Sequence, residues 1–230
     1  AFNILINIGQ GVIISSIVEK RNIENIDISF SNLSVFLDTN FIFALLGLSD
    51  VETEKAAKEL IGLIKEHRNI SLKLLPFTLD EIISFLNRAM RDYSSVYYNE
   101  EIPLTGARYI LSKWNKTDIQ MLINDVEEKL NREFGIVTVY DYNQKLYDED
   151  DISKLNEFKI DKMPTQKSVE HDSNAIEWIE KLRGKKVTSI EDSKYLFLSL
   201  DHRLFRYVTR FHEGSKPEVI TPEALTAILW

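Results

Sequence analysis

Short apolar segments alternate with longer amphipathic segments along this chain, and this alternation narrows the choice of fold more than any other feature. Residues 35–37, 70–74, 195–200 and 219–220 read as strands, and segments with helical periodicity lie between and after them. Strands that alternate with helices form a parallel sheet with helices on both faces. We therefore expect an α/β fold, a three-layer α/β/α sandwich with a central parallel sheet, to which a helical insertion is added.

Two capping boxes predict where helices begin. Ser49 with Glu52, and Thr78 with Glu81, each combine a hydroxyl with an acid three residues later. Further helices are expected at residues 41–48, 168–182 and 203–212, and a last one at the C-terminus.

Residues 92–165 have a less regular pattern. Helices are expected at 105–114 and 118–134, and a strand-like run follows at 136–140. The next stretch, YDEDDISKLNEFKIDKMPTQ, is acidic and polar. It reads as a solvated loop with one helical turn, so we interpret 92–165 as a helical and loop insertion.

The chain as a whole divides into an N-terminal segment, residues 1–32, and one domain, residues 33–230, which contains the insertion. The first 18 residues carry no charge, but polar residues and glycines interrupt them and no basic flank precedes them. We therefore expect neither a transmembrane helix nor a signal peptide. Such an apolar segment would pack on the domain or on a partner, and it would also suit a homodimer.

Composition restricts the chemistry available to the chain. Its 230 residues include no cysteine, which excludes disulfides, thiolate zinc sites and a cysteine nucleophile and fits a reducing, cytoplasmic location. The formal charge of −8 disfavours a polyanion over the whole surface, because phosphate binding depends on basic side chains. Contact with nucleic acid would need a local basic patch or bound cations.

Four acids occupy similar positions relative to the expected elements. Asp38 and Asp201 each end an apolar strand and precede a helix, whereas Glu81 and Asp172 lie in early turns of helices. Ligands of parallel α/β sheets bind at the carboxyl ends of the strands. All four acids are therefore expected at one edge of the sheet.

Helix capping is the simpler explanation for each acid taken alone. Acids are favoured at helix N-termini, because they accept hydrogen bonds from free N–H groups and meet the positive end of the helix dipole. Four acids in one pocket would instead repel one another and raise one another's pKa. A fold keeps such a cluster when divalent cations compensate it, and Mg²⁺ and Mn²⁺ prefer oxygen ligands.

The segments around these acids resemble one family. VFLDTNFI at Asp38, HDSNAI at Asp172 and FLSLDHRLF at Asp201, with Glu81 after the second strand, are similar to the motifs of the PIN domain, a metal-dependent nuclease fold. The similarity covers about residues 33–225 except the inserted region, which compact PIN toxins lack.

Two polar residues support the resemblance. Asn40 is the polar residue two positions after the first aspartate, and Ser199 keeps a hydroxyl where many PIN domains have threonine. We expect both to assist the acids rather than to react themselves.

The resemblance implies a nuclease that uses Mg²⁺ or Mn²⁺ and most often cleaves RNA. Asp38, Asp172 and Asp201 would hold metal, and Glu81 would complete the catalytic site. Asp80 is the alternative to Glu81. Because neighbouring side chains on a helix point about 100° apart, we expect one of the two to face the metal and the other to point away. A cognate inhibitor or a fused upstream domain would be a further partner of such a protein.

Three other functions fit parts of the pattern. An inactive PIN-like binding or scaffold module would lack metal affinity, and a DNA nuclease would use the same acids. A haloacid-dehalogenase-like phosphatase needs a second aspartate two residues after the first. This chain has Asn40 at that position, which disfavours the phosphatase.

Basic and aromatic residues give weaker signals. Arg203, Arg206 and Arg210 recur on the helix after Asp201 and would hold phosphate groups or form a solvated face. Arg88, Arg91, Lys185 and Lys186 are further basic candidates.

Histidines and tyrosines near these segments have competing interpretations. His171 and His202 each neighbour a predicted ligand, and we expect them at the surface or behind the ligands. Tyr93, Tyr97 and Tyr98 would stack on bases or, as the simpler reading, pack in a core or interface.

Overall fold

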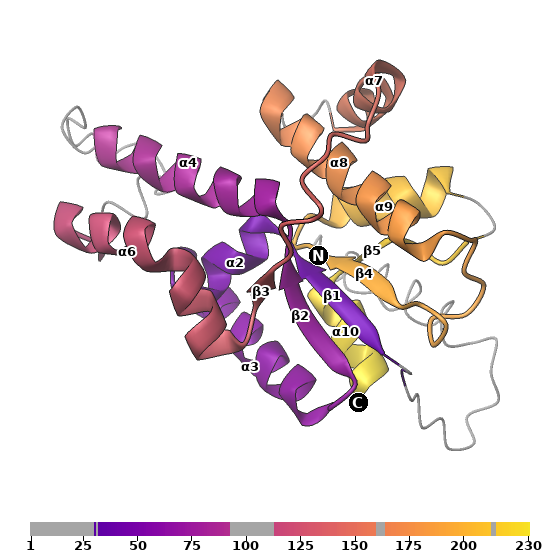
Figure 1. Ribbon diagram of the computed structural model, residues 1–230, viewed down its shortest axis with the longest axis horizontal. Helices are drawn as coiled ribbons and strands as arrows, with labels where there is room; N and C mark the ends of the chain where they lie inside the picture. The colour runs from indigo at the N-terminus through magenta and orange to yellow at the C-terminus, as the bar shows by residue number, and fades with distance from the viewer. Residues whose placement is uncertain (1–29, 31, 93–112, 160–163, 213–214) are drawn as a thin grey trace, which may run out of the picture.

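The computed structural model describes residues 30, 32–92, 113–159, 164–212 and 215–230. Within these ranges, five parallel strands form one sheet in the order β3-β2-β1-β4-β5 (Figure 1). The strands are β1 (Leu33–Leu37), β2 (Ile70–Leu74), β3 (Val137–Thr138), β4 (Tyr195–Leu198) and β5 (Val219–Ile220). The predicted α/β class with a parallel sheet is therefore confirmed.

Helices connect the strands and cover both faces of the sheet. They are α2 (Thr39–Leu45), α3 (Val51–Glu66), α4 (Pro76–Asp92), α6 (Lys116–Lys129), the π-helical turn η1 (Leu130–Phe134), α7 (Glu149–Phe158), α8 (Gln166–Arg183), α9 (His202–Phe211) and α10 (Pro222–Leu229).

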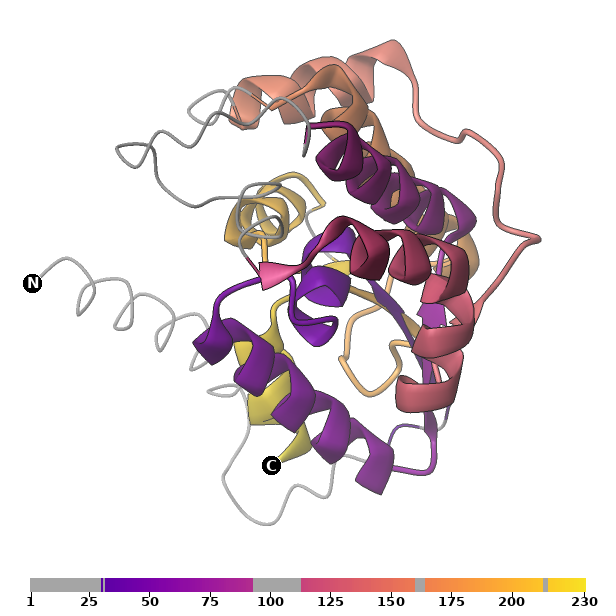
Figure 2. The same cartoon turned by 90° about the vertical axis from the view of Figure 1, so that its left-hand side faces the viewer.

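Alternate residues of β1 enter two different hydrophobic cores. Val35 and Leu37 pack with residues of α2, α3, α4, α6 and α10, whereas Phe36 packs with residues of α7, α8 and α9. Side chains alternate between the faces of a strand, so the two cores lie on opposite faces of the sheet. Figure 1 shows α7, α8 and α9 together on one side, and in Figure 2 the yellow α10 lies beside α3, which it contacts.

Two helix starts differ from the predicted capping boxes. Asp50, not Ser49, caps α3, because its side chain accepts hydrogen bonds from the backbone N–H and the hydroxyl of Thr53. Helix α4 begins at Pro76, where the fixed φ of proline favours a first helical position. Thr78 is therefore a buried residue inside α4 and does not cap it.

The acidic segment YDEDDISKLNEFKIDKMPTQ contains a helix of ten residues, so the prediction of a loop with one helical turn is wrong. Asp148 caps α7 and forms a capping box with Asp151. Ile152, Leu155 and Phe158 recur at three-residue spacing and join the core on the α8 side of the sheet. The charged residues between them concealed this apolar stripe.

The region that we interpreted as an insertion contributes to the main core. Strand β3 pairs with β2 at the edge of the sheet, and α6 packs against α4. Most of segment 1–32, most of the predicted helix 105–114 and the tyrosines Tyr93, Tyr97 and Tyr98 lie outside the described residues. Among the helices that the structure describes, none combines the length and apolar character needed to cross a bilayer.

The strand order creates a switch point at the centre of the sheet. From β1 the chain proceeds to β2 and β3 on one side, and it later returns to β4 and β5 on the other side. The connections that leave β1 and β4 therefore diverge. In open α/β sheets, the crevice at the carboxyl ends of such strands is the usual ligand site, and Asp38 and Ser199 directly follow β1 and β4.

Candidate metal site at the switch point of the sheet

Asp38 lies at the end of β1 and is 4% exposed. Its Oδ1 accepts a hydrogen bond of 2.7 Å from the backbone N–H of Thr39, so it caps α2. Its Oδ2 accepts hydrogen bonds of 2.7 Å from the Asn40 amide and 2.5 Å from the Ser199 hydroxyl. These donors are all neutral groups, so they orient the carboxylate without supplying a positive charge.

The loop after β4 is tied to the same acid. The Ser199 hydroxyl accepts a hydrogen bond of 3.0 Å from the backbone N–H of Asp201. Asn40 Oδ1 accepts one of 3.0 Å from the backbone N–H of Leu200. The two polar residues predicted to assist the acids thus join the ends of β1 and β4.

Asp201 caps α9 and pairs with two cations. Its Oδ1 accepts a hydrogen bond of 3.0 Å from the backbone N–H of Arg203 and lies 3.6 Å from Arg203 Nε. Its Oδ2 lies 2.7 Å from Lys159 Nζ. Burial alone would raise the pKa of Asp201, but the charge and hydrogen bond of Lys159 and the contacts with Arg203 hold it below its usual value.

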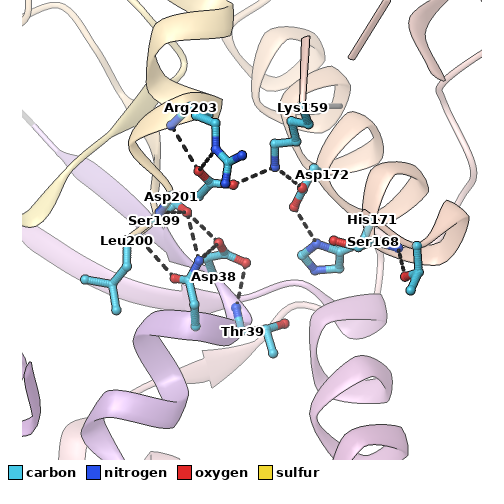
Figure 3. A network of polar contacts seen from close by, with 12 residues as sticks. Asp38, Thr39, Lys159, Ser168, His171, Asp172, Ser199, Leu200, Asp201 and Arg203 are labelled. Carbon is cyan, nitrogen blue, oxygen red and sulfur yellow. Dashed lines mark hydrogen bonds and ion pairs between the residues drawn. The ribbon is translucent and has the colours of Figure 1, made fainter. Parts of the chain in front are cut away.

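Asp172 projects from α8 toward the same place and is 6% exposed. Its Oδ2 lies 2.5 Å from Lys159 Nζ and its Oδ1 lies 3.3 Å from His171 Nδ1 (Figure 3). Lys159 therefore bridges Asp172 and Asp201, which come from different helices.

Glu81 faces the cluster from α4 and is more exposed than the aspartates, with a third of its side chain accessible. Its Oε2 accepts a hydrogen bond from the Thr39 hydroxyl and lies 3.5 Å from His171 Nε2. Asp80 is exposed, so Glu81 is the member of the pair that contacts the cluster.

The structure thus brings together all four predicted acids. Helix capping and convergence are not alternatives here, because Asp38 and Asp201 do both. Asp172 lies well inside α8 and Glu81 inside α4. Capping accounts for two acids of the cluster and leaves these two unexplained.

His171 is a member of the cluster that the sequence did not reveal. It is 8% exposed and its Nε2 lies 2.9 Å from the Thr78 hydroxyl. Burial would lower its pKa, but the hydrogen bond with Asp172 and the charges of Glu81, Asp38 and Asp172 raise the pKa to about 9. Of the two expected positions, at the surface or behind a ligand, His171 takes the buried one beside Asp172, whereas His202 is partly exposed, with 43% of its side chain accessible.

Lys159 is the second residue that the sequence did not reveal. Its side chain is 5% exposed. Burial would lower the pKa of this ammonium, but Asp172 and Asp201 outweigh burial and raise it. No motif marks the position, although the apolar stripe of α7 could have identified the helix that ends there.

Charge in the cluster is compensated unevenly. Burial and the nearby charge of Asp172 raise the pKa of Asp38 to about 7, against the opposing effects of His171 and Ser199. Asp201, which contacts Lys159 and Arg203, shows the opposite shift. The ionised form of Asp38 is therefore less well compensated by its neighbours than that of Asp201.

Three residues have the spacing of a metal site. Asp38, His171 and Asp172 each place one ligand atom within 4.8 Å of the others, and all three are buried. Carboxylate oxygens are the ligands that Mg²⁺ and Mn²⁺ prefer, and burial and the charge of Asp172 raise the pKa of Asp38 where no cation compensates them. The donor set therefore fits a divalent cation.

Two cavities adjoin the cluster. One, of about 730 Å³, lies on the Glu81 side, and its lining includes the basic residues Arg88, Lys145 and Lys167 together with the acidic residues Asp80 and Glu170. The other, of about 620 Å³, lies on the Asp201 side and includes Arg206. Basic side chains thus flank the acids on both sides despite the negative net charge of the chain.

The two predicted phosphate-binding arginines differ in their surroundings. Arg203 has 16% of its side chain exposed and lies against Asp201. Both arginines line the cavity on that side, and Arg206 is exposed and has no carboxylate partner among the ion pairs of the described residues. Arg206 is therefore the better placed of the two to meet an anionic ligand.

Comparison of the chain with protein-family models, with curated proteins and with solved structures gives no match. The fold and site themselves define the class: an α/β protein with a parallel sheet and a buried carboxylate cluster at its switch point.

Proposed function

We propose that this chain is a PIN-type, metal-dependent nuclease that cleaves phosphodiester bonds in single-stranded or structured RNA. The observation that carries the proposal is the convergence of Asp38, Asp172 and His171, with ligand atoms within 4.8 Å of one another, beside Glu81 and Asp201. Acids from distant parts of the chain gather at the place where an α/β sheet binds its ligands.

The residues of the chain have separate roles in this proposal. Asp38 and Asp172 would hold Mg²⁺ or Mn²⁺, with Glu81 and Asp201 completing the acidic site. Such an ion, when bound, supplies an activated water and stabilises charge on the leaving oxygen. Ser199 and Asn40 fix the orientation of Asp38 through their hydrogen bonds.

The flanking cavities favour a polymer over a small phosphate ester. Basic side chains on both sides of the acids would hold successive phosphates of one strand, so that the bond between them lies at the metal. Tyr147 lines the cavity on the Glu81 side and offers a ring on which an unpaired base would stack. A flexible single strand can bend into such a site more readily than a duplex.

Cleavage of labelled single-stranded RNA and DNA in Mg²⁺, Mn²⁺ or EDTA tests the proposal. We expect RNA cleavage that EDTA abolishes and that Asp38→Asn and Asp172→Asn reduce by about 100-fold or more. Asp125→Asn, an exposed acid on α6, is the matched control and should cleave at the wild-type rate. Equal cleavage by wild type and Asp38→Asn would identify a contaminant, and faster cleavage of DNA would favour the DNA nuclease.

A further inference from the structure

Lys159 occupies a position that a cation would take in a carboxylate site. Its Nζ lies 2.5 Å from Asp172 Oδ2 and 2.7 Å from Asp201 Oδ2. Figure 3 shows the side chain pointing between these two carboxylates. One ammonium thus joins two of the four acids on which the proposed nuclease depends.

Packing of α7 against neighbouring helices holds Lys159 in its buried position. Lys159 follows the last residue of α7, a helix that contacts α8 and α9. The rings of Tyr207 and Phe211 on α9 lie 5.7 and 6.0 Å from that of Phe158. These contacts fix the end of α7 over the acids, so the lysine is held there by the core as well as by charge.

Burying an ammonium is costly unless it is paired and hydrogen-bonded. Lys159 meets this condition, because both of its carboxylate partners are within hydrogen-bond distance. The same pairing neutralises the repulsion that Asp172 and Asp201 would otherwise exert on each other.

The two halves of the site differ in charge compensation. On the Asp201 side, Lys159 and Arg203 both contact the carboxylate. On the Asp38 side, the contacting donors are the neutral groups of Thr39, Asn40 and Ser199. The Asp201 carboxylate therefore has two cationic contacts and the Asp38 carboxylate has none, although the His171 ring lies within 4.8 Å of Asp38.

We propose that the Lys159 ammonium takes the place of a second divalent ion, so that this site holds one ion, between Asp38 and Asp172. Asp201 then holds Lys159 in position and is not a metal ligand. The inference rests on the proposed function, which it deepens by fixing the number of ions. It also gives the end of α7 a role in the site.

Titration of the purified chain with Mn²⁺ tests the inference. Calorimetry measures the heat of binding, and electron paramagnetic resonance measures the free Mn²⁺. We expect wild type to bind one ion at this site and Lys159→Gln to bind two, because Asp172 and Asp201 then lose their cation. Lys154→Gln removes an exposed lysine that pairs with Asp150 on the same helix. This matched control should bind one ion with wild-type affinity.

Asp201→Asn provides a second test that does not depend on the folding of Lys159→Gln, since asparagine caps a helix as well as aspartate. We expect Asp201→Asn to change the Mn²⁺ dissociation constant by less than about threefold and Asp172→Asn to weaken binding by about tenfold or more. A comparable loss in both variants would overturn the inference.

The other outcomes separate the inference from the proposed function. If wild type cleaves RNA and binds two ions at this site, the inference alone is overturned. The same holds if folded Lys159→Gln binds one ion with wild-type affinity. If wild type neither binds Mn²⁺ nor cleaves RNA, both proposals are overturned.

Discussion

The Ser199 hydroxyl donates a 2.5 Å hydrogen bond to Asp38 Oδ2 and so joins the ends of β4 and β1 across 161 residues of sequence. The same oxygen accepts a hydrogen bond of 3.0 Å from the backbone N–H of Asp201. Ser199 is fully buried. One hydroxyl therefore fixes the positions of two acids that the sequence separates widely.

Replacement of Ser199 by alanine should impair the site more than the fold. Asp38 would lose a donor that favours its ionised form, so we expect kcat/KM for RNA to fall by about 10- to 100-fold and the free energy of unfolding by about 1–2 kcal/mol. Ser199→Thr should recover much of the activity, because it keeps the hydroxyl. Ser34→Ala, which removes a hydroxyl bonded to Ser71, is the control and should leave kcat/KM unchanged.

Asp38→Asn should stabilise the metal-free fold at high pH. In EDTA, the raised pKa of Asp38, about 7, means that the folded state binds this proton more tightly than the unfolded state. Wild type therefore loses stability from this group as the pH rises from about 4 to about 7. At pH 8 we expect the variant to be more stable by about 1–3 kcal/mol.

Urea unfolding of Asp38→Asn and wild type at several pH values measures this difference. The gain should vanish near pH 4, where Asp38 is protonated in the folded state. Equal stability of the two proteins at pH 8 would contradict the uneven charge compensation of the cluster.

Arg206→Gln should weaken substrate binding without affecting the chemical step. Arg206 is exposed in the cavity beside Asp201, so we expect KM for RNA to rise several-fold with kcat unchanged. The slope of log K against log salt should fall by about one unit. Arg210→Gln removes an exposed arginine one turn further along α9 and should have little effect on either quantity, whereas equal effects of both variants would remove Arg206 from the binding surface.

His171→Gln should destabilise the metal-free protein. The imidazolium lies between Glu81 and Asp172, and removing one partner of a buried charge cluster costs about 3 kcal/mol. The pKa of His171 is raised to about 9, so its stabilising charge is fully present below about pH 6.5 and is lost as the pH rises through about 9.

The difference in unfolding free energy between wild type and His171→Gln in EDTA should therefore be largest below pH 6.5 and smaller above pH 9. His202→Gln, which changes a partly exposed histidine, is the matched control. A difference that does not vary with pH would show that His171 acts by packing alone.

The sequence predicted the parts of the fold that depend on local pattern. Alternation of apolar residues in 70–74 predicted β2, and the short apolar pair at 219–220 predicted β5. The gathering of the four acids followed from topology, since the carboxyl ends of parallel strands meet at one edge of a sheet. That inference needed the order of elements but not the side-chain packing.

His171 and Lys159 could not be predicted in the same way. The direction of His171 depends on how α8 is rotated against the sheet, and a neighbour of Asp172 in sequence would ordinarily point elsewhere. Lys159 lies in a segment whose many charges concealed α7. Its burial depends on tertiary contacts of α7 that no local pattern contains.

An anomalous difference map from crystals of wild type soaked in Mn²⁺ tests the central claim most directly, because it locates the ion without reference to activity. We predict a peak within coordination distance of the carboxylates of Asp38 and Asp172, and its disappearance in crystals of Asp38→Asn/Asp172→Asn. Absence of a peak between these two carboxylates in wild type at saturating Mn²⁺ would contradict the assignment of this cluster as a metal site.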